Sequence, residues 1–282
     1  MPSASAGHPT GRVAEVAIPL GTLVDDLLAE TRALDDVLVM LASDQWDAPT
    51  PAPGWLVRDQ VSHLAYFDDA TVMAVCEPER FARERAVAVV DIDAFTARVA
   101  ADHHGCNATT LLQWWRDART RLAEVLGALD PSARVPWYGP DMSVPTALTA
   151  RVMETWAHGQ DVVDAVGATR PATPALRHVA HLGVRTLANS FTTRGRPPPG
   201  ELVRVELRAP DDEGVWDWGP PDAANSIAGP ALDFCLVVTQ RRHVLDTGLV
   251  VRGPVATEWM AIAQAFAGPP GAGRTPGQFG AP

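Results

Sequence analysis

The spacing of apolar residues predicts that the first two-thirds of the chain is helical. Between Ile18 and Ala42, apolar side chains recur every three or four positions with acidic residues on the opposite face, which is typical of an amphipathic helix. Further segments with helical spacing are 57–75, 93–101, 109–129 and 145–166. The four long segments predict an antiparallel four-helix bundle, whereas the charged stretch 77–92 predicts no regular element.

Residue types at the expected helix ends fit these boundaries. Thr109 is of the type that caps a helix N-terminus. Pro145 lacks the N–H group that the first turn of a helix leaves unpaired, so it fits the start of the last bundle helix. Gly167 tolerates the left-handed backbone that often closes a helix.

The pattern changes after Pro174. Residues Leu202 to Ala209 alternate between apolar and polar types, which predicts a half-buried strand. Shorter strands are expected at 215–218 and 226–228, and helices at 175–190, 231–241 and 255–266. The resulting prediction is a leader at 1–15, a helical bundle at 16–170, an α+β domain at 171–268 and a flexible Gly/Pro-rich tail at 269–282.

Composition and charge narrow the classes of partner. Of 282 residues, 46% are hydrophobic and 20% are charged, as in ordinary globular proteins. The formal net charge of −11 argues against nucleic acid or an anionic membrane as a partner, and no apolar stretch has the length of a membrane-spanning helix. The N-terminus lacks a secretory signal, and the three cysteines form no CxxC motif. We therefore expect a cytoplasmic protein that acts on a small molecule.

Glu154 and His158 are the most informative pair of residues. They are four positions apart in the helix expected at 145–166, so the carboxylate and the imidazole lie on one face. This helix is otherwise apolar enough to pack in a core, where an isolated carboxylate is strongly disfavoured. His63, in the helix expected at 57–75, would complete a two-histidine, one-carboxylate metal site with open positions. The alternative is an exposed Glu–His pair and a histidine that is satisfied elsewhere.

Arg151 and Asp161 extend the face of this pair by one turn in each direction. They could orient metal ligands or receive a substrate. Equally, each could form an ordinary salt bridge on the helix surface. Among the remaining histidines, those at 103 and 104 fit a helix C-terminus, where they would interact with the helix dipole. His178 and His181 have no accompanying carboxylate or cysteine, and we expect them to be solvated.

Two segments resemble the signatures of the mycothiol-dependent maleylpyruvate isomerase family, which belongs to the wider DinB-like metalloenzymes. Residues 53–64, PGWLVRDQVSHL, look like the "GW…D…HL" signature, and residues 154–161, ETWAHGQD, match a Glu-x-x-x-His-x-x-Asp run on the last bundle helix. The resemblance covers about residues 18–167. It implies a DinB-like bundle in which His63, Glu154 and His158 hold a divalent ion of the zinc type.

The second half resembles, more weakly, the sterol-carrier-like α+β domain that many family members append. In the isomerase an arginine of this domain reaches the active site, and the closest equivalent is Arg241, where members often read T-G-R. Here Gln240 stands in place of the glycine, which leaves Arg241 and Arg242 as alternatives. A second departure is Leu56, where a small hydroxyl residue commonly caps the helix, so a weaker helix start is expected.

The resemblance predicts a divalent-metal-dependent enzyme with zinc as the expected ion. It implies that mycothiol serves as a cosubstrate of an isomerase or S-transferase acting on a small electrophilic or unsaturated substrate. The chain resembles in particular a subgroup known only as metal-binding proteins, so two alternatives stay open. One is a thiol-independent tailoring enzyme that catalyses cyclisation, dehydration or hydrolysis in a biosynthetic pathway. The other is a non-catalytic protein that binds a metal or a small ligand.

Overall fold

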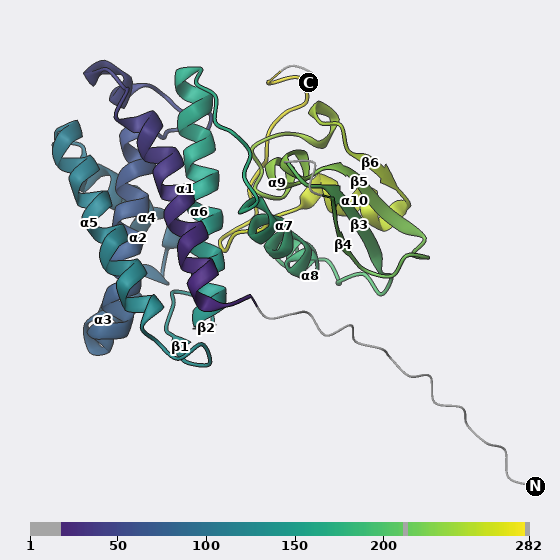
Figure 1. Ribbon diagram of the computed structural model, residues 1–282, viewed down its shortest axis with the longest axis horizontal. Helices are drawn as coiled ribbons and strands as arrows, with labels where there is room; N and C mark the ends of the chain where they lie inside the picture. The colour runs from purple at the N-terminus through teal and green to yellow at the C-terminus, as the bar shows by residue number, and fades with distance from the viewer. Residues whose placement is uncertain (1–17, 211–213, 280–282) are drawn as a thin grey trace, which may run out of the picture.

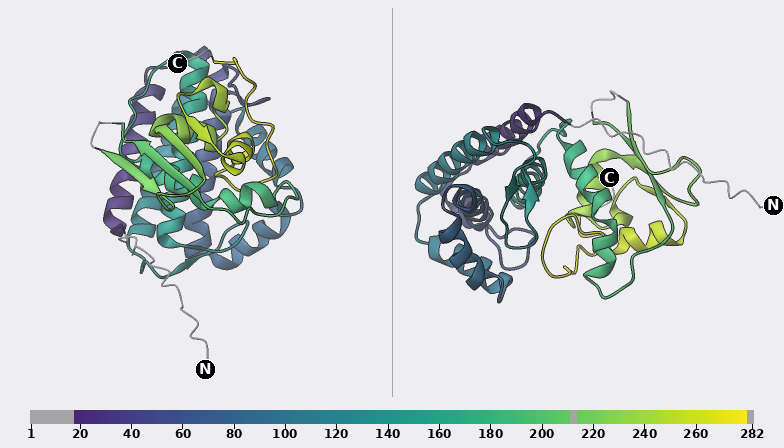
Figure 2. Two further views of the ribbon diagram at one scale, coloured as in Figure 1. Left: turned by 90° about the vertical axis from the view of Figure 1, so that its right-hand side faces the viewer. Right: turned by 90° about the horizontal axis from the view of Figure 1, so that it is seen from below.

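The computed structural model describes residues 18–210 and 214–279, so the leader expected at 1–15 lies outside the described residues (Figure 1). Long helices form one part of the molecule, and a twisted sheet with shorter helices forms a second part beside it (Figures 1 and 2). The prediction of a mainly helical chain with some sheet is confirmed. None of the described helices is long and apolar enough to cross a membrane.

Four long helices pack side by side: α1 (Leu20–Leu38), α2 (Val57–Cys76), α5 (Ala108–Gly127) and α6 (Val144–Val166). Two clusters of buried side chains define their directions. One cluster joins the ends of α1 and α6 to the starts of α2 and α5, through Leu34, Val162, Val61 and Trp115. The other joins the opposite ends, through Leu27, Leu148, Ala74 and Leu126. Helices α1 and α6 therefore run in one direction, and α2 and α5 run in the other.

Local side chains begin and end the long helices. Ser143 caps α6 by accepting a hydrogen bond from the backbone N–H of Thr146, and Gly167 closes the helix with φ 64°. Asn107 caps α5 in the same way, so the prediction of Thr109 as the cap is wrong. Both residue types can cap a helix, and the choice depends on where the chain turns into the bundle.

Two further helices, α3 (Pro78–Ala88) and α4 (Ile92–His103), lie beside α2. The prediction of no regular element at 77–92 is wrong for residues 78–88. Within α3 the buried residues are Phe81 and Ala88, so most of the helix faces water and shows little apolar periodicity. Pro78 fits the first turn, where its missing N–H is not needed.

The sheet of the second part has the strand order β4-β3-β5-β6. Its strands are β3 (Val203–Arg208), β4 (Val215–Trp218), β5 (Asn225–Pro230) and β6 (Val250–Arg252). Strand β3 pairs antiparallel with β4 and parallel with β5. Strand β6 was not predicted, because three residues are too few to show an alternating pattern.

The helices of the second part share one core with the sheet. They are α7 (Leu176–Arg185), α8 (Leu187–Thr192), α9 (Ala231–Val238) and α10 (Pro254–Ile262). Alternate residues of β3 contribute to this core, so the helices cover one face of the sheet. The single helix expected at 175–190 is interrupted at Thr186. A short ribbon, β1 (Arg134–Val135) with β2 (Met142–Ser143), and the 3-10 helices η1 (Ser43–Asp47) and η2 (Val244–Asp246) complete the described elements.

The two parts meet at α6. Met153, Trp156 and Ala157 of this helix belong to the buried core of the second part. The C-terminal segment, residues 266–279, runs between the two parts (Figure 2). Residues from 269 onward were expected to be flexible. The segment contacts the second part where Arg194 donates a hydrogen bond to the carbonyl of Gly271. The helix that carries Glu154 and His158 is therefore also the helix on which the second part docks.

Candidate metal centre

The structure brings His63, Glu154 and His158 together between α2 and α6. One potential ligand atom from each residue lies within 4.8 Å of the other two. The Oε2 atom of Glu154 is 3.1 Å from Nε2 of His158 and 3.6 Å from Nε2 of His63. All three side chains are largely buried, with exposed fractions between 13% and 22%. The alternative of an exposed Glu–His pair therefore does not describe this site.

Gln60 orients the ring of His158. The amide nitrogen of Gln60 donates a hydrogen bond to Oγ1 of Thr50, whose hydroxyl donates in turn to the carbonyl of Trp55. The amide oxygen of Gln60 is therefore the atom that accepts from Nδ1 of His158. Because Nδ1 is committed to Gln60, Nε2 is the ring nitrogen that faces Glu154 and that a metal could bind. Gln60 was not predicted, although its position three residues before His63 places both on one helix face.

His63 presents Nε2 to Glu154, and its Nδ1 is buried with no hydrogen-bond partner among the described residues. Burial, followed by the nearby His158, lowers the pKa of His63 to about 3, although Glu154 opposes the shift. The ring is therefore neutral near pH 7, which is the form that binds a metal. Burial raises the pKa of Glu154, but hydrogen bonds from His158 and His63 outweigh burial and hold that pKa well below its usual range.

These three residues fit a divalent cation. Two imidazole nitrogens and one carboxylate oxygen lie close together, which is a donor set typical of zinc and related ions. Aromatic rings hold the ligands in place. Trp55 stacks on His158 with ring centroids 5.8 Å apart, and Phe67 lies 4.5 Å from the ring of His63. These rings give the cluster an apolar surrounding on the cavity side.

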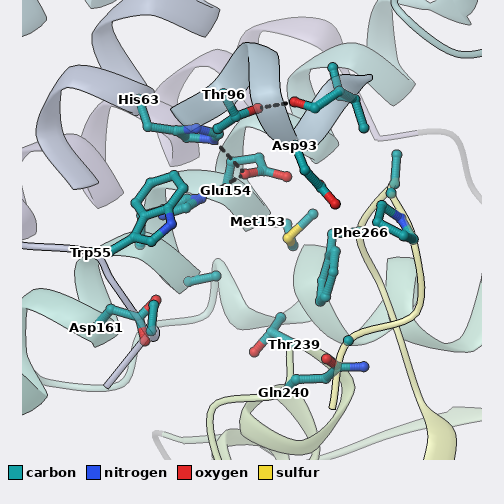
Figure 3. A pocket seen from close by; sticks show the side chains of 18 of the residues that line it. Trp55, His63, Asp93, Thr96, Met153, Glu154, Asp161, Thr239, Gln240 and Phe266 are labelled. Carbon is teal, nitrogen blue, oxygen red and sulfur yellow. Dashed lines mark hydrogen bonds and ion pairs between the residues drawn. The ribbon is translucent and has the colours of Figure 1, made fainter. Parts of the chain in front are cut away.

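A cavity of about 820 Å³ opens beside the three residues. Figure 3 shows Trp55, His63 and Glu154 on one wall. The second part of the molecule supplies the opposite wall through Thr239, Gln240 and Phe266, and α4 contributes Asp93 and Thr96. The candidate metal centre thus faces a space that both parts of the molecule enclose.

Arg241 lines this cavity, and its Nη2 donates to Oδ2 of Asp161 over 2.7 Å. Arg242 instead pairs with Asp164 and lies over the ring of Phe279, 3.7 Å from its centroid. Of the two alternatives, Arg241 is therefore the one that the structure places at the cavity. Gln240 has φ 61°, a left-handed conformation that favours glycine, which explains why family members often have glycine at this position.

Arg151 and Asp161 are buried at the cavity rather than exposed in surface salt bridges. Arg151 donates to Asp68 over 2.9 Å. Asp161 accepts hydrogen bonds from both Arg241 and Arg274. The arginine in the C-terminal segment was not predicted, because its distance along the chain from Asp161 gives no local signal.

One expectation about another residue needs correction. His178 is 5% exposed and its Nε2 lies 2.6 Å from Oδ2 of Asp26, so the prediction that it is solvated is wrong. The packing of α7 between α6 and α9 buries it beside a partner that the sequence does not reveal. At the start of α2, Oδ2 of Asp59 accepts from the backbone N–H of Leu56 over 2.8 Å. The carboxylate of Asp59 thus pairs with the backbone N–H of Leu56, while the apolar side chain of Leu56 provides no cap, as expected.

Comparison with known proteins connects this geometry to a family. A family model described as the mycothiol maleylpyruvate isomerase N-terminal domain matches residues 27–163, and one described as wyosine base formation matches residues 199–252. Uncharacterised proteins from two strains of Mycobacterium tuberculosis are 44% identical over 254 residues, which span 90% of this chain and 98% of each relative.

Solved structures show a related fold. The crystal structure of the mycothiol-dependent maleylpyruvate isomerase superimposes with a TM-score of 0.55 at 17% identity, covering 80% of this chain and 90% of that one. A histidine-to-alanine variant of that enzyme superimposes with a TM-score of 0.54 at 15% identity. Together with the sequence matches, these similarities show that the chain belongs to the mycothiol-dependent maleylpyruvate isomerase family.

Proposed function

We propose that the protein is a divalent-metal-dependent enzyme that uses mycothiol as a cosubstrate, either to isomerise a small unsaturated acid or to transfer the thiol to a small electrophile. The observation that carries the proposal is the convergence of His63, Glu154 and His158 on the wall of a cavity of about 820 Å³. Family membership supports the choice of a thiol. The cavity is large enough for a small substrate beside the sulfur end of a cosubstrate.

His63, Glu154 and His158 would hold the cation, and zinc is the expected ion. Bound there, it would supply Lewis acidity and lower the pKa of a thiol or water that it coordinates. Gln60 accepts from Nδ1 of His158, so Nε2 is the ring nitrogen that would bind the cation. Trp55 covers one side of the site, because its ring contacts both imidazole rings.

Arg241 would contact the substrate from the opposite wall of the cavity. Its side chain is 12% exposed, and its guanidinium is held by the carboxylate of Asp161 and the carbonyl of Thr239. A fixed guanidinium at this wall can orient an anionic or carbonyl oxygen of the substrate before reaction. We assign it the catalytic role on this basis.

The proposal also covers the fold of the two parts and the cellular compartment of the protein. We infer that the helical part, over residues 16–170, is a DinB-like bundle, because a metal site between α2 and α6 fits that arrangement. The second part, over residues 171–268, would be the appended sterol-carrier-like domain. A reactive thiol cosubstrate and three free cysteines fit the reducing cytoplasm.

The test uses the full-length protein. Metal is removed with a chelator and Zn²⁺ is restored, and turnover of maleylpyruvate is followed with and without mycothiol. Binding of mycothiol alone is measured by calorimetry on both forms. We expect mycothiol to bind more tightly to the zinc-loaded form, and turnover to need both components. Metal-loaded protein that is indifferent to mycothiol would rule out the thiol and favour the tailoring enzyme.

His158→Ala separates an enzyme from a carrier. An enzyme should lose metal and turnover in this variant while its fold, measured by circular dichroism, is kept. A non-catalytic carrier should still bind its small ligand. His243→Ala is the matched control, since His243 caps η2 and does not line the cavity of the metal centre.

A further inference from the structure

The C-terminal segment carries a second arginine into the cavity. Residues from Phe266 to Arg274 line its wall. The side chain of Arg274 is 9% exposed, and its Nη2 lies 2.9 Å from Oδ1 of Asp161 on α6. The segment therefore reaches back from the second part of the molecule to the helix that holds two of the candidate metal ligands.

Arg241 and Arg274 share one carboxylate. Arg241 binds Oδ2 of Asp161 and Arg274 binds Oδ1, so both oxygens of this buried side chain are occupied. The adjacent Asp164 adds a second negative charge, and both of its oxygens accept from a third arginine, Arg242. The cluster of three arginines and two aspartates keeps one uncompensated positive charge at the cavity wall.

Each of these two arginines also has an unused donor. The Nε atoms of Arg241 and Arg274 are buried and have no hydrogen-bond partner among the described residues. Buried donors without a partner are uncommon in folded proteins, and each calls for an acceptor. Guanidinium groups bind carboxylates with particular strength, because a charge-assisted pair can form through two nitrogens. An uncompensated charge on two guanidinium groups that line the cavity therefore fits a small carboxylate.

The position of this cluster relative to the metal centre follows from α6. Glu154, His158 and Asp161 succeed one another at intervals of four and three residues, so they lie on one face of the helix. One helical turn advances about 5.4 Å. The arginine cluster thus begins about one turn beyond the last metal ligand, a separation that a small organic acid can span.

The second part of the molecule holds the segment in this position. A side chain at Gly271 would overlap Oε1 of Gln240, so the segment lies directly on the turn that precedes Arg241. Arg194 donates to the carbonyl of Gly271 over 2.9 Å. Gln264 donates to the carbonyls of Phe266, Gly268 and Pro269. Arg274 is therefore presented by a segment that the second part of the molecule holds at several points.

We propose that Arg274 and Arg241 together bind a carboxylate group of the substrate, which makes the C-terminal segment part of the substrate site. The substrate class is a small organic acid whose carboxylate lies about one helical turn from its reacting atoms. The inference rests on the proposed function for placing those reacting atoms at His63, Glu154 and His158. The family resemblance implies an arginine at 241, and the contribution of Arg274 is specific to the geometry of this chain.

The test measures binding of succinate by calorimetry to the full-length protein, both zinc-loaded and after removal of metal. Succinamide, which has the same length without charge, is the ligand control. We expect Arg274→Gln to weaken succinate binding roughly tenfold or more in both forms, the loss of a charge-assisted hydrogen bond. Arg196→Gln makes the same charge change at a surface pair with Glu258, outside the cavity, and should leave succinate affinity unchanged.

A purely structural role of Arg274 would lower the melting temperature and leave succinate affinity of the folded protein unchanged, which would overturn the proposal. Equal binding of succinamide and succinate would also overturn it. If Arg274→Gln does not fold, phenylglyoxal modification of the wild-type protein gives a second measurement. Succinate should protect Arg241 and Arg274 from the reagent, as located by peptide mass spectrometry, and modification at an unchanged rate would contradict the proposal.

The outcome is independent of the thiol chemistry. Succinate binding is measured without mycothiol, so a failure of thiol-dependent turnover leaves the carboxylate site standing. Conversely, succinate affinity that does not depend on Arg274 would remove this site and leave the metal and thiol experiments unaffected.

Discussion

His63 and His158 present the same ring nitrogen to Glu154, but the two rings are held in different ways. Gln60 accepts the Nδ1 proton of His158, whereas Nδ1 of His63 has no partner among the described residues. The orientation of His158 therefore depends on one amide side chain, and that of His63 on packing against Trp55 and Phe67.

Gln60→Ala is expected to lower metal affinity by about 10–100-fold, as the loss of an outer hydrogen-bond partner of a metal-binding histidine does. Without Gln60 the ring of His158 can turn and exchange its two nitrogens. Affinity is measured by competition with a coloured chelator. Gln60→Glu keeps an acceptor at this position and should retain most of the affinity. Equal affinities in all three proteins would show that Gln60 does not orient the ring.

The metal-free protein should lose stability as the pH falls below about 6.5. Burial lowers the pKa of His63 to about 3, and the positive charges of His158 and Arg151 act in the same direction. The hydrogen bond and negative charge of Glu154 oppose this shift. Between pH 6.5 and that value the unfolded chain binds a proton at position 63 that the folded chain does not bind, so protonation favours unfolding. From pH 7 to pH 5 the free energy of unfolding should fall by up to about 2 kcal/mol from this residue.

Urea unfolding of chelator-treated protein at several pH values checks this prediction. His63→Asn removes the titrating ring, so its stability should depend less on pH across the same range. If the stability of this variant depends on pH as strongly as that of the wild type, groups other than His63 cause the loss of stability.

At the scale of the elements, α6 combines the site with the contact between the two parts. Glu154, His158 and Asp161 face the cavity, while Met153 and Trp156 enter the core of the second part. A displacement of this helix would change the metal centre and the interface together. The cap that begins α6 is therefore relevant to the site.

Asn107→Ala should destabilise the protein by about 1 kcal/mol, the usual cost of losing an N-cap side chain. The side chain of Asn107 accepts from the backbone N–H of Thr110 over 2.9 Å. Thr109→Ala is the control, because Thr109 is exposed in the first turn of α5 and makes no cap. Thermal unfolding of both variants measures the difference, and an equal loss at both positions would contradict the assignment of the cap.

At the scale of the whole molecule, the cavity exists because two parts of different architecture face one another. The helical part supplies the three candidate metal ligands, and the second part supplies Arg241 and the segment that contains Arg274. Asp161 joins the parts by binding both arginines. Neither part alone contains a complete site.

Asp161→Asn should lower the free energy of unfolding by about 3–5 kcal/mol, because it leaves two largely buried guanidinium groups without their shared charge. Asp36→Asn, on the exposed face of α1, should change stability by no more than about 0.5 kcal/mol. Urea unfolding compares the two variants. An Asp161→Asn protein as stable as the wild type would show that the arginines find other partners.

Much of this protein could be read from local patterns. The apolar spacing predicted the four long helices, because a helix that packs on a core must carry an apolar stripe of fixed period. The same periodicity placed Glu154 and His158 on one face. Short or solvated elements such as α3 and β6 escaped prediction, since they bury few side chains and show little pattern.

The sequence by itself determined the helical framework, the pairing of Glu154 with His158 and, through a family signature, the choice of His63. Only the tertiary structure decided that Gln60 orients His158 and that Arg241 rather than Arg242 faces the cavity. It also decided that Arg274, 113 residues from Asp161 along the chain, reaches the same carboxylate. The physical reason is that helix periodicity acts over a few residues, whereas these contacts arise when two separately formed surfaces pack together.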